Sequence, residues 1–337
     1  MRMRDMGITR RGLIGGAGTL AALVAGGCAS APASRGSAAG AKGSAASSAE
    51  PVRVRMGTMV TEDFLPGWAA GDRGLFPSSV AVEISTFQSA QELSTALAAG
   101  EIDMAMTDPQ VSASLAAGGT DVRLLWIALG ATPAQGRFGI QVGPDSKIGS
   151  VEALRGASIG VGSNTVPEYV MDKLLEAAGI TDADFKKEEV KKMPVRFQMM
   201  ISGKTDAAAL PASLLALGEA QGCKTIVDDT KGENLSQSVI IARTAFADEH
   251  ADAVDAVRKG WDAAAGQIDD DPESFRRLLV EKANLAEPLK ESYKVPEYPV
   301  GVAPTSDEVQ PQLDWMLEKG YLKQALSFDG KTGAFEA

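Results

Sequence analysis

Residues 102–109, with the sequence IDMAMTDP, decide the fold class. The apolar residues over 102–106 predict a buried β-strand, and Asp108 followed by Pro109 is typical of a helix start. A helix is therefore expected over residues 110–117. A strand that leads directly into a helix is the repeating unit of α/β proteins.

The same unit recurs on both sides of this stretch. Strands alternating with helical patterns predict parallel sheets and an α/β fold. After Asp248, helical patterns dominate, with expected helix starts near Asp271 and Asp307. The other predicted strands cover residues 52–56, 80–84, 122–129, 159–161 and 207–210, and the other predicted helices cover residues 68–75, 91–99 and 168–178.

Two nearly continuous apolar segments, residues 138–142 and 239–242, bracket the second α/β block. A chain that leaves one domain and later returns to it forms a two-lobed protein with two crossover strands. We therefore predict that residues 51–140 and 240–337 form lobe 1, and that residues 141–239 form lobe 2.

The N-terminus has the pattern of an export signal. Arg10 and Arg11 precede an apolar run at residues 13–24, which is too short to span a bilayer, and small residues lead to Cys28. The paired arginines resemble a twin-arginine signal, and the small residues before Cys28 resemble a lipoprotein signal in which that cysteine is acylated. The alternative is an ordinary secretory signal in which Cys28 is incidental. Residues 1–27 are thus predicted as signal peptide and 28–50 as a lipidated, flexible Ala/Ser/Gly tether.

Charge and cysteine content exclude several classes of protein. Residues 1–27 carry four arginines and one aspartate, so their removal changes the formal net charge from −11 to −14. Such an acidic chain is repelled by a phosphate backbone, which excludes nucleic acid as an expected partner. With Cys28 used for the anchor, Cys223 has no disulfide partner and is expected to be a buried, inert thiol.

Polar loops follow several of the predicted strands. In parallel sheets, ligands bind at the carboxyl ends of the strands, where helix N-termini present unpaired N–H groups. Each loop can instead simply cap its own helix, so the motifs taken singly leave both interpretations open. These loops are residues 58–63, 89–92, 108–109, 163–168 and 211–213; residues 89–92 and 165–168 have the spacing of capping boxes.

Three segments resemble the substrate-binding lipoproteins of ABC importers in the nitrate, sulfonate, taurine and thiamine-precursor group. Residues 145–161, DSKIGSVEALRGASIGV, carry the most specific similarity. Residues 97–105, LAAGEIDMA, and residues 246–254, FADEHADAV, are also similar to segments of that group. Order and spacing agree over residues 52–265.

The resemblance implies a type II periplasmic-binding-protein fold that clamps a small molecule between two α/β lobes. It implies a monomeric, extracytoplasmic carrier without a cofactor or metal, which delivers its ligand to an ABC permease and ATPase. The ligand class expected from it is a sulfonate, nitrate, a carboxylate or a thiamine precursor. The contact residues that it implies are Thr58, Thr61, Gln88, Ser89, Thr107, Asp108, Ser163, Asn164 and Thr165.

Two other functions stay open at this point. A ligand-sensing receptor without transport would have the same sequence features. A fold-related enzyme of thiamine or menaquinone precursor metabolism is less favoured, because the single histidine, His250, permits no histidine-based triad. The charge of the ligand is also open. Helix N-termini and Arg137 favour an anion, whereas Glu62, Asp63 and Asp108 favour an amine.

Overall fold

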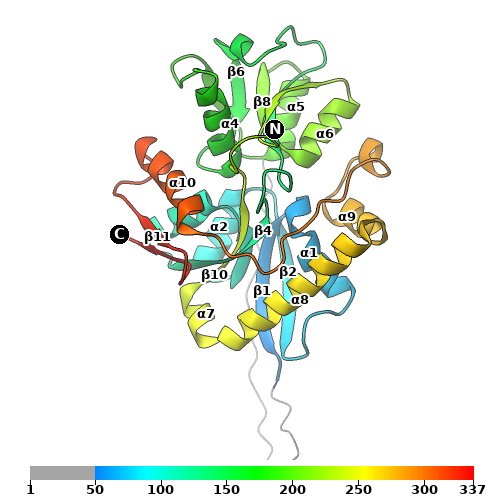
Figure 1. Cartoon of the computed structure of the whole chain (residues 1–337), viewed down its shortest axis with the longest axis vertical. Coiled ribbons are helices and arrows are strands. Elements are labelled where there is room, and N and C mark those ends of the chain that lie inside the picture. Colours follow the sequence, from blue (N-terminus) through cyan, green and yellow to red (C-terminus); the bar gives the residue numbers. More distant parts are fainter. Residues whose placement is uncertain (1–49) are drawn as a thin grey trace, which may run out of the picture. The chain divides into compact units, whose positions relative to one another are not determined.

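The computed structural model describes residues 50–337, which belong to one compact unit (Figure 1). The predicted signal peptide, Arg10, Arg11 and Cys28 lie outside the described residues, as does the tether except for Glu50. Among residues 50–337, no helix combines the length and the apolar character needed to cross a membrane.

Lobe 1 is built on a seven-stranded sheet with the order β11-β12-β4-β10-β3-β1-β2. Strand β1 pairs in parallel with β2 and β3, whereas β10 runs antiparallel to both β3 and β4. The carboxyl ends of β1, β2 and β3 therefore meet at one edge of the sheet. Its strands are β1 (Val52–Met59), β2 (Val80–Phe87), β3 (Met104–Thr107), β4 (Val122–Leu129), β10 (Ser238–Arg243), β11 (Ser327–Asp329) and β12 (Ala334–Glu336).

Helices cover both faces of this sheet (Figure 1). On one face α1, α8 and α9 enclose a core in which Trp261 contacts Phe64 and Trp126 edge to face, with ring centroids 5.3 and 6.0 Å apart. On the other face α2, α3 and α10 bury a second apolar cluster. The helices are α1 (Leu65–Asp72), α2 (Ala90–Ala98), α3 (Pro109–Ala117), α7 (Thr244–Glu249), α8 (Ala251–Asp270), α9 (Arg276–Lys282) and α10 (Ser306–Glu318), with short 3₁₀ helices η1 (Glu62–Phe64), η3 (Pro272–Phe275) and η4 (Glu287–Leu289).

Lobe 2 has a five-stranded sheet with the order β7-β6-β8-β5-β9. Strand β6 is parallel to β7 and β8, and β5 is antiparallel to β8 and β9. Cys223 is buried beside this sheet, and burial raises the pKa of its thiol, as expected for an inert cysteine. The elements are β5 (Phe138–Val142), β6 (Ser158–Val161), β7 (Lys186–Glu189), β8 (Ala207–Pro211), β9 (Lys224–Asp228), α4 (Val166–Ala177), α5 (Met193–Ile201), α6 (Ala212–Ala220) and η2 (Glu152–Leu154).

The chain crosses between the lobes twice, after β4 and after β9. The apolar strands β5 and β10 each lie within a sheet, and the crossings at residues 130–137 and 229–237 contain no strand. The crossings touch at Gly130, which has a φ of +87° and where a Cβ atom would lie 1.9 Å from the carbonyl oxygen of Ser236. Only glycine fits this position, because a side chain would separate the two crossings.

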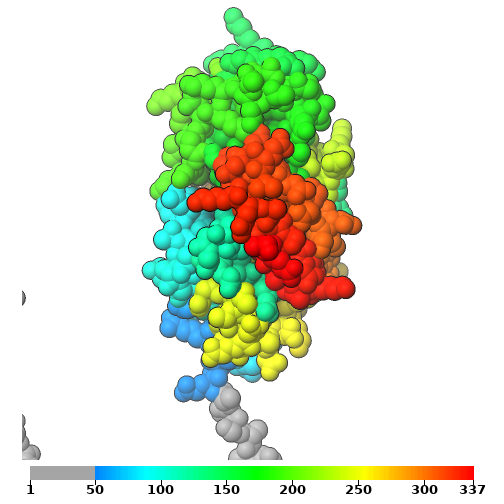
Figure 2. All heavy atoms as spheres, turned by 90° about the vertical axis from the view of Figure 1, so that its left-hand side faces the viewer, coloured from blue at the N-terminus to red at the C-terminus, as the bar shows by residue number. Residues whose placement is uncertain are grey.

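The C-terminal segment extends lobe 1 towards lobe 2. Strands β11 and β12 add to the edge of the lobe 1 sheet at β4. Helix α10 packs on α3, and Trp315 of α10 and Tyr321 beyond its end contact α4 of lobe 2. Figure 2 shows this segment, orange to red, lying against both lobes.

Candidate functional site: a cavity between the two lobes

A cavity of about 290 Å³ lies between the lobes. Lobe 1 contributes mainly the residues that follow β1, β2 and β3, and lobe 2 contributes mainly those that follow β6 and β7, together with Pro211 at the end of β8. This position follows from the topology, because the carboxyl ends of parallel strands and the helix N-termini next to them meet at one edge.

Seven of the nine predicted contact residues line this cavity, namely Thr61, Ser89, Thr107, Asp108, Ser163, Asn164 and Thr165. The other two do not. The Thr58 side chain is fully buried and its hydroxyl donates to the carbonyl oxygen of Met59, 3.0 Å away. Gln88 is exposed, and its backbone N–H donates to Glu92 at the start of α2. Both are neighbours of lining residues.

Asp108 connects the two lobes. Its Oδ1 accepts a hydrogen bond from the backbone N–H of Val111 in α3 (2.7 Å), and its Oδ2 accepts one from Val166 N at the start of α4 (3.1 Å). One carboxylate thus caps a helix of each lobe. Burial raises the pKa of Asp108 to about 6, although both hydrogen bonds favour the ionised form.

Further hydrogen bonds cross between the lobes around the cavity. Asn164 Nδ2 donates to Ser114 Oγ over 2.6 Å, and Lys191 Nζ donates to Gln91 Oε1 over 2.7 Å. The predicted capping box of α4 is wrong, because the Thr165 hydroxyl donates to the carbonyl oxygen of Gly162. Glu168 instead accepts from Asn164 N and from side chains outside α4.

Several buried polar atoms of the cavity wall have no hydrogen-bond partner within residues 50–337. Native proteins pair nearly all buried polar atoms, so such atoms need an explanation. A polar ligand in the cavity would supply the missing partners. These atoms are Thr61 Oγ1, Thr107 Oγ1, Asn164 Oδ1 and Ser238 Oγ; the first and the last lie near the Asp63 carboxylate and favour its ionised form.

Arg196 is a cavity residue that the sequence did not indicate. It lies on α5, is 2% exposed, and its Nε and Nη1 donate to the carbonyl oxygens of Val190 (3.0 Å) and Ala209 (2.9 Å). Within residues 50–337 it forms no ion pair, although the negative charges of Glu189 and Glu168 act on it from a greater distance. Burial lowers the pKa of Arg196 to about 10, which leaves it charged at neutral pH.

The acids of the first loop lie at the opposite wall. Asp63 lines the cavity, and its burial together with neighbouring Glu62 raises its pKa to about 7. Glu62 borders a second cavity of about 400 Å³ next to the crossings, and Asp63 and Phe138 line both cavities. Arg137, considered above as a ligand contact, lines only this second cavity and already pairs with Glu219 and Asp228.

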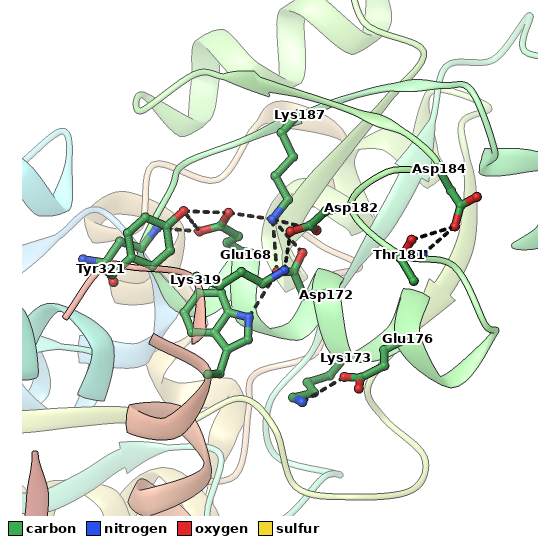
Figure 3. Close-up of polar contacts among 12 residues, drawn as sticks. Glu168, Asp172, Lys173, Glu176, Thr181, Asp182, Asp184, Lys187, Lys319 and Tyr321 are labelled. Carbon is green, nitrogen blue, oxygen red and sulfur yellow. Dashed lines mark hydrogen bonds and ion pairs between the residues drawn. The ribbon is translucent and has the colours of Figure 1, made fainter. Parts of the chain in front are cut away.

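A separate cluster of charged residues joins α4 to the C-terminal segment (Figure 3). We call it the α4–α10 cluster; it comprises Glu168, Asp172, Asp182, Lys187, Trp315, Lys319 and Tyr321. Lys187 Nζ lies 2.9 Å from carboxylate oxygens of both Glu168 and Asp172. From the C-terminal segment, Trp315 Nε1 donates to Asp172 and the Tyr321 hydroxyl donates to Glu168.

A family model described as "NMT1/THI5 like" matches residues 61–274. This match covers more than half of the chain, which therefore belongs to the NMT1/THI5-like family. No curated protein matches the sequence.

Solved structures share the fold. The alkanesulfonate-binding protein SsuA from Xanthomonas axonopodis pv. citri, bound to MOPS, has a TM-score of 0.71 and 19% identity over 82% of this chain and 96% of that one. The aliphatic sulphonate binding protein SsuA from Escherichia coli has a TM-score of 0.72 and 18% identity over 85% of this chain and 92% of that one. The nitrate-binding protein NrtA from Synechocystis PCC 6803 has a TM-score of 0.70 and 15% identity over 81% of this chain and 83% of that one. These are binding proteins rather than enzymes, and the likeness confirms the predicted two-lobed periplasmic-binding-protein fold.

Proposed function

We propose that this protein is the extracytoplasmic solute-binding component of an ABC importer and that it holds a small molecule in the cavity between its lobes. The observation that carries the proposal is the set of buried, unpartnered polar atoms on both walls of that cavity. Family membership supports it, as does the likeness to sulfonate- and nitrate-binding proteins. The ligand class is accordingly a sulfonate, nitrate, a carboxylate or a thiamine precursor.

The mechanism is closure of the lobes around the solute. Each wall belongs to a different lobe, so a solute that bonds to both walls favours the closed form. The two crossings that touch at Gly130 form the hinge. The permease and ATPase of the importer would then recognise the closed form, and the carrier itself needs neither a cofactor nor a catalytic step.

A solute screen tests this function. The purified protein, in its exported form, is mixed with sulfonates, nitrate, carboxylates, amino acids and pyrimidines, and its melting temperature and radius of gyration are measured. A solute at a hundred times its dissociation constant adds about 2.7 kcal/mol to stability and raises the melting temperature by several degrees. A solute that stabilises the protein, compacts it and is recovered unchanged supports the proposal, whereas turnover of that solute would indicate an enzyme.

Import distinguishes a carrier from a sensor. Deletion of the gene for this protein should abolish uptake of the identified solute, and the variant Thr107→Val should reduce uptake at low solute concentration. Normal uptake in the deletion strain, with loss of a transcriptional response to the solute, would instead favour the sensor. The enzyme alternative has no support from the cavity, because His250, the single histidine of the sequence, does not line it.

We also propose export by the twin-arginine route, acylation of Cys28 and function as a membrane-anchored monomer. Replacement of Arg10 and Arg11 by lysine should block export through that route. Cys28→Ala should release the protein from the membrane fraction and abolish labelling by a fatty acid. If Cys28→Ala stays in the membrane fraction, the proposed anchor is contradicted. Light scattering of the released Cys28→Ala protein, measured without detergent, reports whether it is a monomer.

A further inference from the structure

The cavity between the lobes has opposite charges on its two walls. Arg196 of lobe 2 and Asp63 of lobe 1 both line it, and neither has an oppositely charged partner within residues 50–337. We propose that the ligand is a zwitterion, whose anionic group binds the Arg196 guanidinium and whose ammonium group binds the Asp63 carboxylate. This inference rests on the proposed function and specifies its ligand.

Arg196 is prepared to receive an anion. Two of its nitrogens are held by backbone carbonyl oxygens, so the plane of the guanidinium is fixed, and Nη2 has no acceptor within the described part of the chain. A Cβ atom at Gly162 would lie 2.4 Å from Nη2, so glycine leaves this nitrogen open towards the cavity. A buried charge without a counter-ion is unfavourable, and a fixed guanidinium suits carboxylate or sulfonate oxygens.

Asp63 is prepared to receive a cation. It is 8% exposed and stands beside Glu62, which is 2% exposed. Glu62 Oε1 accepts from the Tyr293 hydroxyl (2.8 Å) and from Ser213 N (3.1 Å), whereas Oε2 is buried without a partner. Two adjacent buried carboxylates therefore lack a balancing cation, and an ammonium group would provide one.

The other charged residues near the cavity are already paired or solvated. Asp108 uses both carboxylate oxygens on backbone N–H groups of the two lobes. Lys191 is exposed and donates to Gln91. Of the cations of the second cavity, Arg137 pairs with two carboxylates and Lys294 is exposed beside Glu297. Glu189 acts on Arg196 from beyond ion-pair distance, and its Oε2 accepts from the backbone N–H and the hydroxyl of Ser163. Arg196 and Asp63 are thus the charges left for a ligand.

The test uses matched probes that differ only in charge. ω-Aminoalkanesulfonates and ω-amino acids with two to six methylene groups are compared by calorimetry with the same sulfonates and carboxylates lacking the amine, and with the alkylamines. For at least one chain length, the zwitterion should bind about tenfold or more tightly than the anion alone, and the amine alone should bind weakest.

Two variants assign the groups. Asp63→Asn should remove the advantage of the zwitterion over the anion, and Arg196→Gln should weaken both by about tenfold or more. Exposed Asp255 and Arg277 provide the matched controls Asp255→Asn and Arg277→Gln, which should bind like the unaltered protein. Circular dichroism and melting curves confirm that each variant is folded.

The outcomes separate this inference from the proposed function. Equal binding of zwitterion and anion, or an unchanged preference in Asp63→Asn, would overturn the inference. If the screen identifies a neutral or singly charged solute that closes the lobes while every zwitterion fails, the inference is also wrong and the carrier function stands. If no solute of any class binds, including solutes retained from cell extract, the carrier function itself fails.

Discussion

The two polar regions that join the lobes differ in how their charges are satisfied. In the α4–α10 cluster, every buried charge faces an opposite charge: Lys187 contacts Glu168, Asp172 and Asp182, and Lys319 contacts Asp172 and Asp182 (Figure 3). In the cavity, Arg196 and Asp63 have no such partner, and four polar side-chain atoms have no hydrogen bond. The buried charges of the α4–α10 cluster are therefore paired with opposite charges, whereas those of the cavity are not.

This difference distinguishes structure from function. Paired buried charges such as those of the α4–α10 cluster belong to the folded structure, and removal of one of them leaves another buried charge uncompensated. Buried polar groups without a partner cost stability, and they persist where a ligand supplies that partner. Mutations in the α4–α10 cluster should therefore lower the stability of the protein, and mutations in the cavity should lower its affinity for the solute.

Loss of Lys187 should have the largest effect. Burial alone would lower the pKa of Lys187, but the carboxylates of Asp172 and Glu168 outweigh it and raise that pKa. Lys187→Met leaves the buried Glu168 carboxylate without a cation, whereas Asp172 keeps Lys319, and we expect the free energy of unfolding in urea to fall by about 3–5 kcal/mol. The control is Lys173→Met, which removes a more exposed pair with Glu176 and should change stability by less than about 0.5 kcal/mol. Equal losses in the two variants would refute the distinction.

The ionisation of Asp108 should make stability depend on pH. Its pKa is about 6 in the folded protein and 3.8 without the fold, so between these values the native state binds more protons than the unfolded state. Stability should therefore fall as the pH rises from about 4 to about 6, by up to about 3 kcal/mol. Asp108→Asn lacks this titration, so the difference in unfolding free energy between the two proteins should follow the pH over this range. Parallel pH profiles would show that Asp108 keeps an ordinary pKa.

Arg196→Met makes the same kind of change as Lys187→Met at an unpaired cation. It removes the desolvation cost of the buried charge but leaves the carbonyl oxygens of Val190 and Ala209 without their donor. These effects oppose each other, so stability should change by no more than about 1 kcal/mol. Affinity for the transported solute, measured by calorimetry, should fall about a hundredfold. A stability loss as large as that of Lys187→Met would place Arg196 among the structural charges.

Local sequence patterns predicted the fold and most of the cavity. Strand and helix periodicity gave the α/β class, and the helix starts at Ser89 and Asp108 indicated the loops that line the cavity, because caps depend on neighbouring residues. The apolar segments at residues 138–142 and 239–242, which bracket the second α/β block, predict the two lobes. The exact boundaries of the lobes stay a prediction.

Long-range contacts could not be predicted in this way. Arg196 lies on an amphipathic helix, where the sequence predicts a solvent-exposed arginine. It is buried because the helix packs against β8. The spacing of Thr165 and Glu168 suggested a capping box, but Tyr321 and Lys187 engage Glu168 instead, and Tyr321 lies 153 positions further along the chain. A sequence pattern carries no signal for such partners.

The smallest effect should come from a single hydroxyl group. Thr107 Oγ1 is buried in the cavity wall without a hydrogen bond, so the isosteric change Thr107→Val removes an unsatisfied group. Stability should stay the same or rise by up to about 1 kcal/mol, while solute affinity should fall about tenfold. Thr225→Val is the matched control outside the cavity, because the Thr225 hydroxyl donates to Glu219 over 2.7 Å. That variant should lose about 1 kcal/mol of stability and keep its affinity, so the two threonines should respond in opposite ways in melting and calorimetry. If Thr107→Val destabilises the protein without weakening the binding of the solute, this hydroxyl stabilises the fold and does not bind the solute. The proposed difference between the cavity and the α4–α10 cluster would then not hold for Thr107.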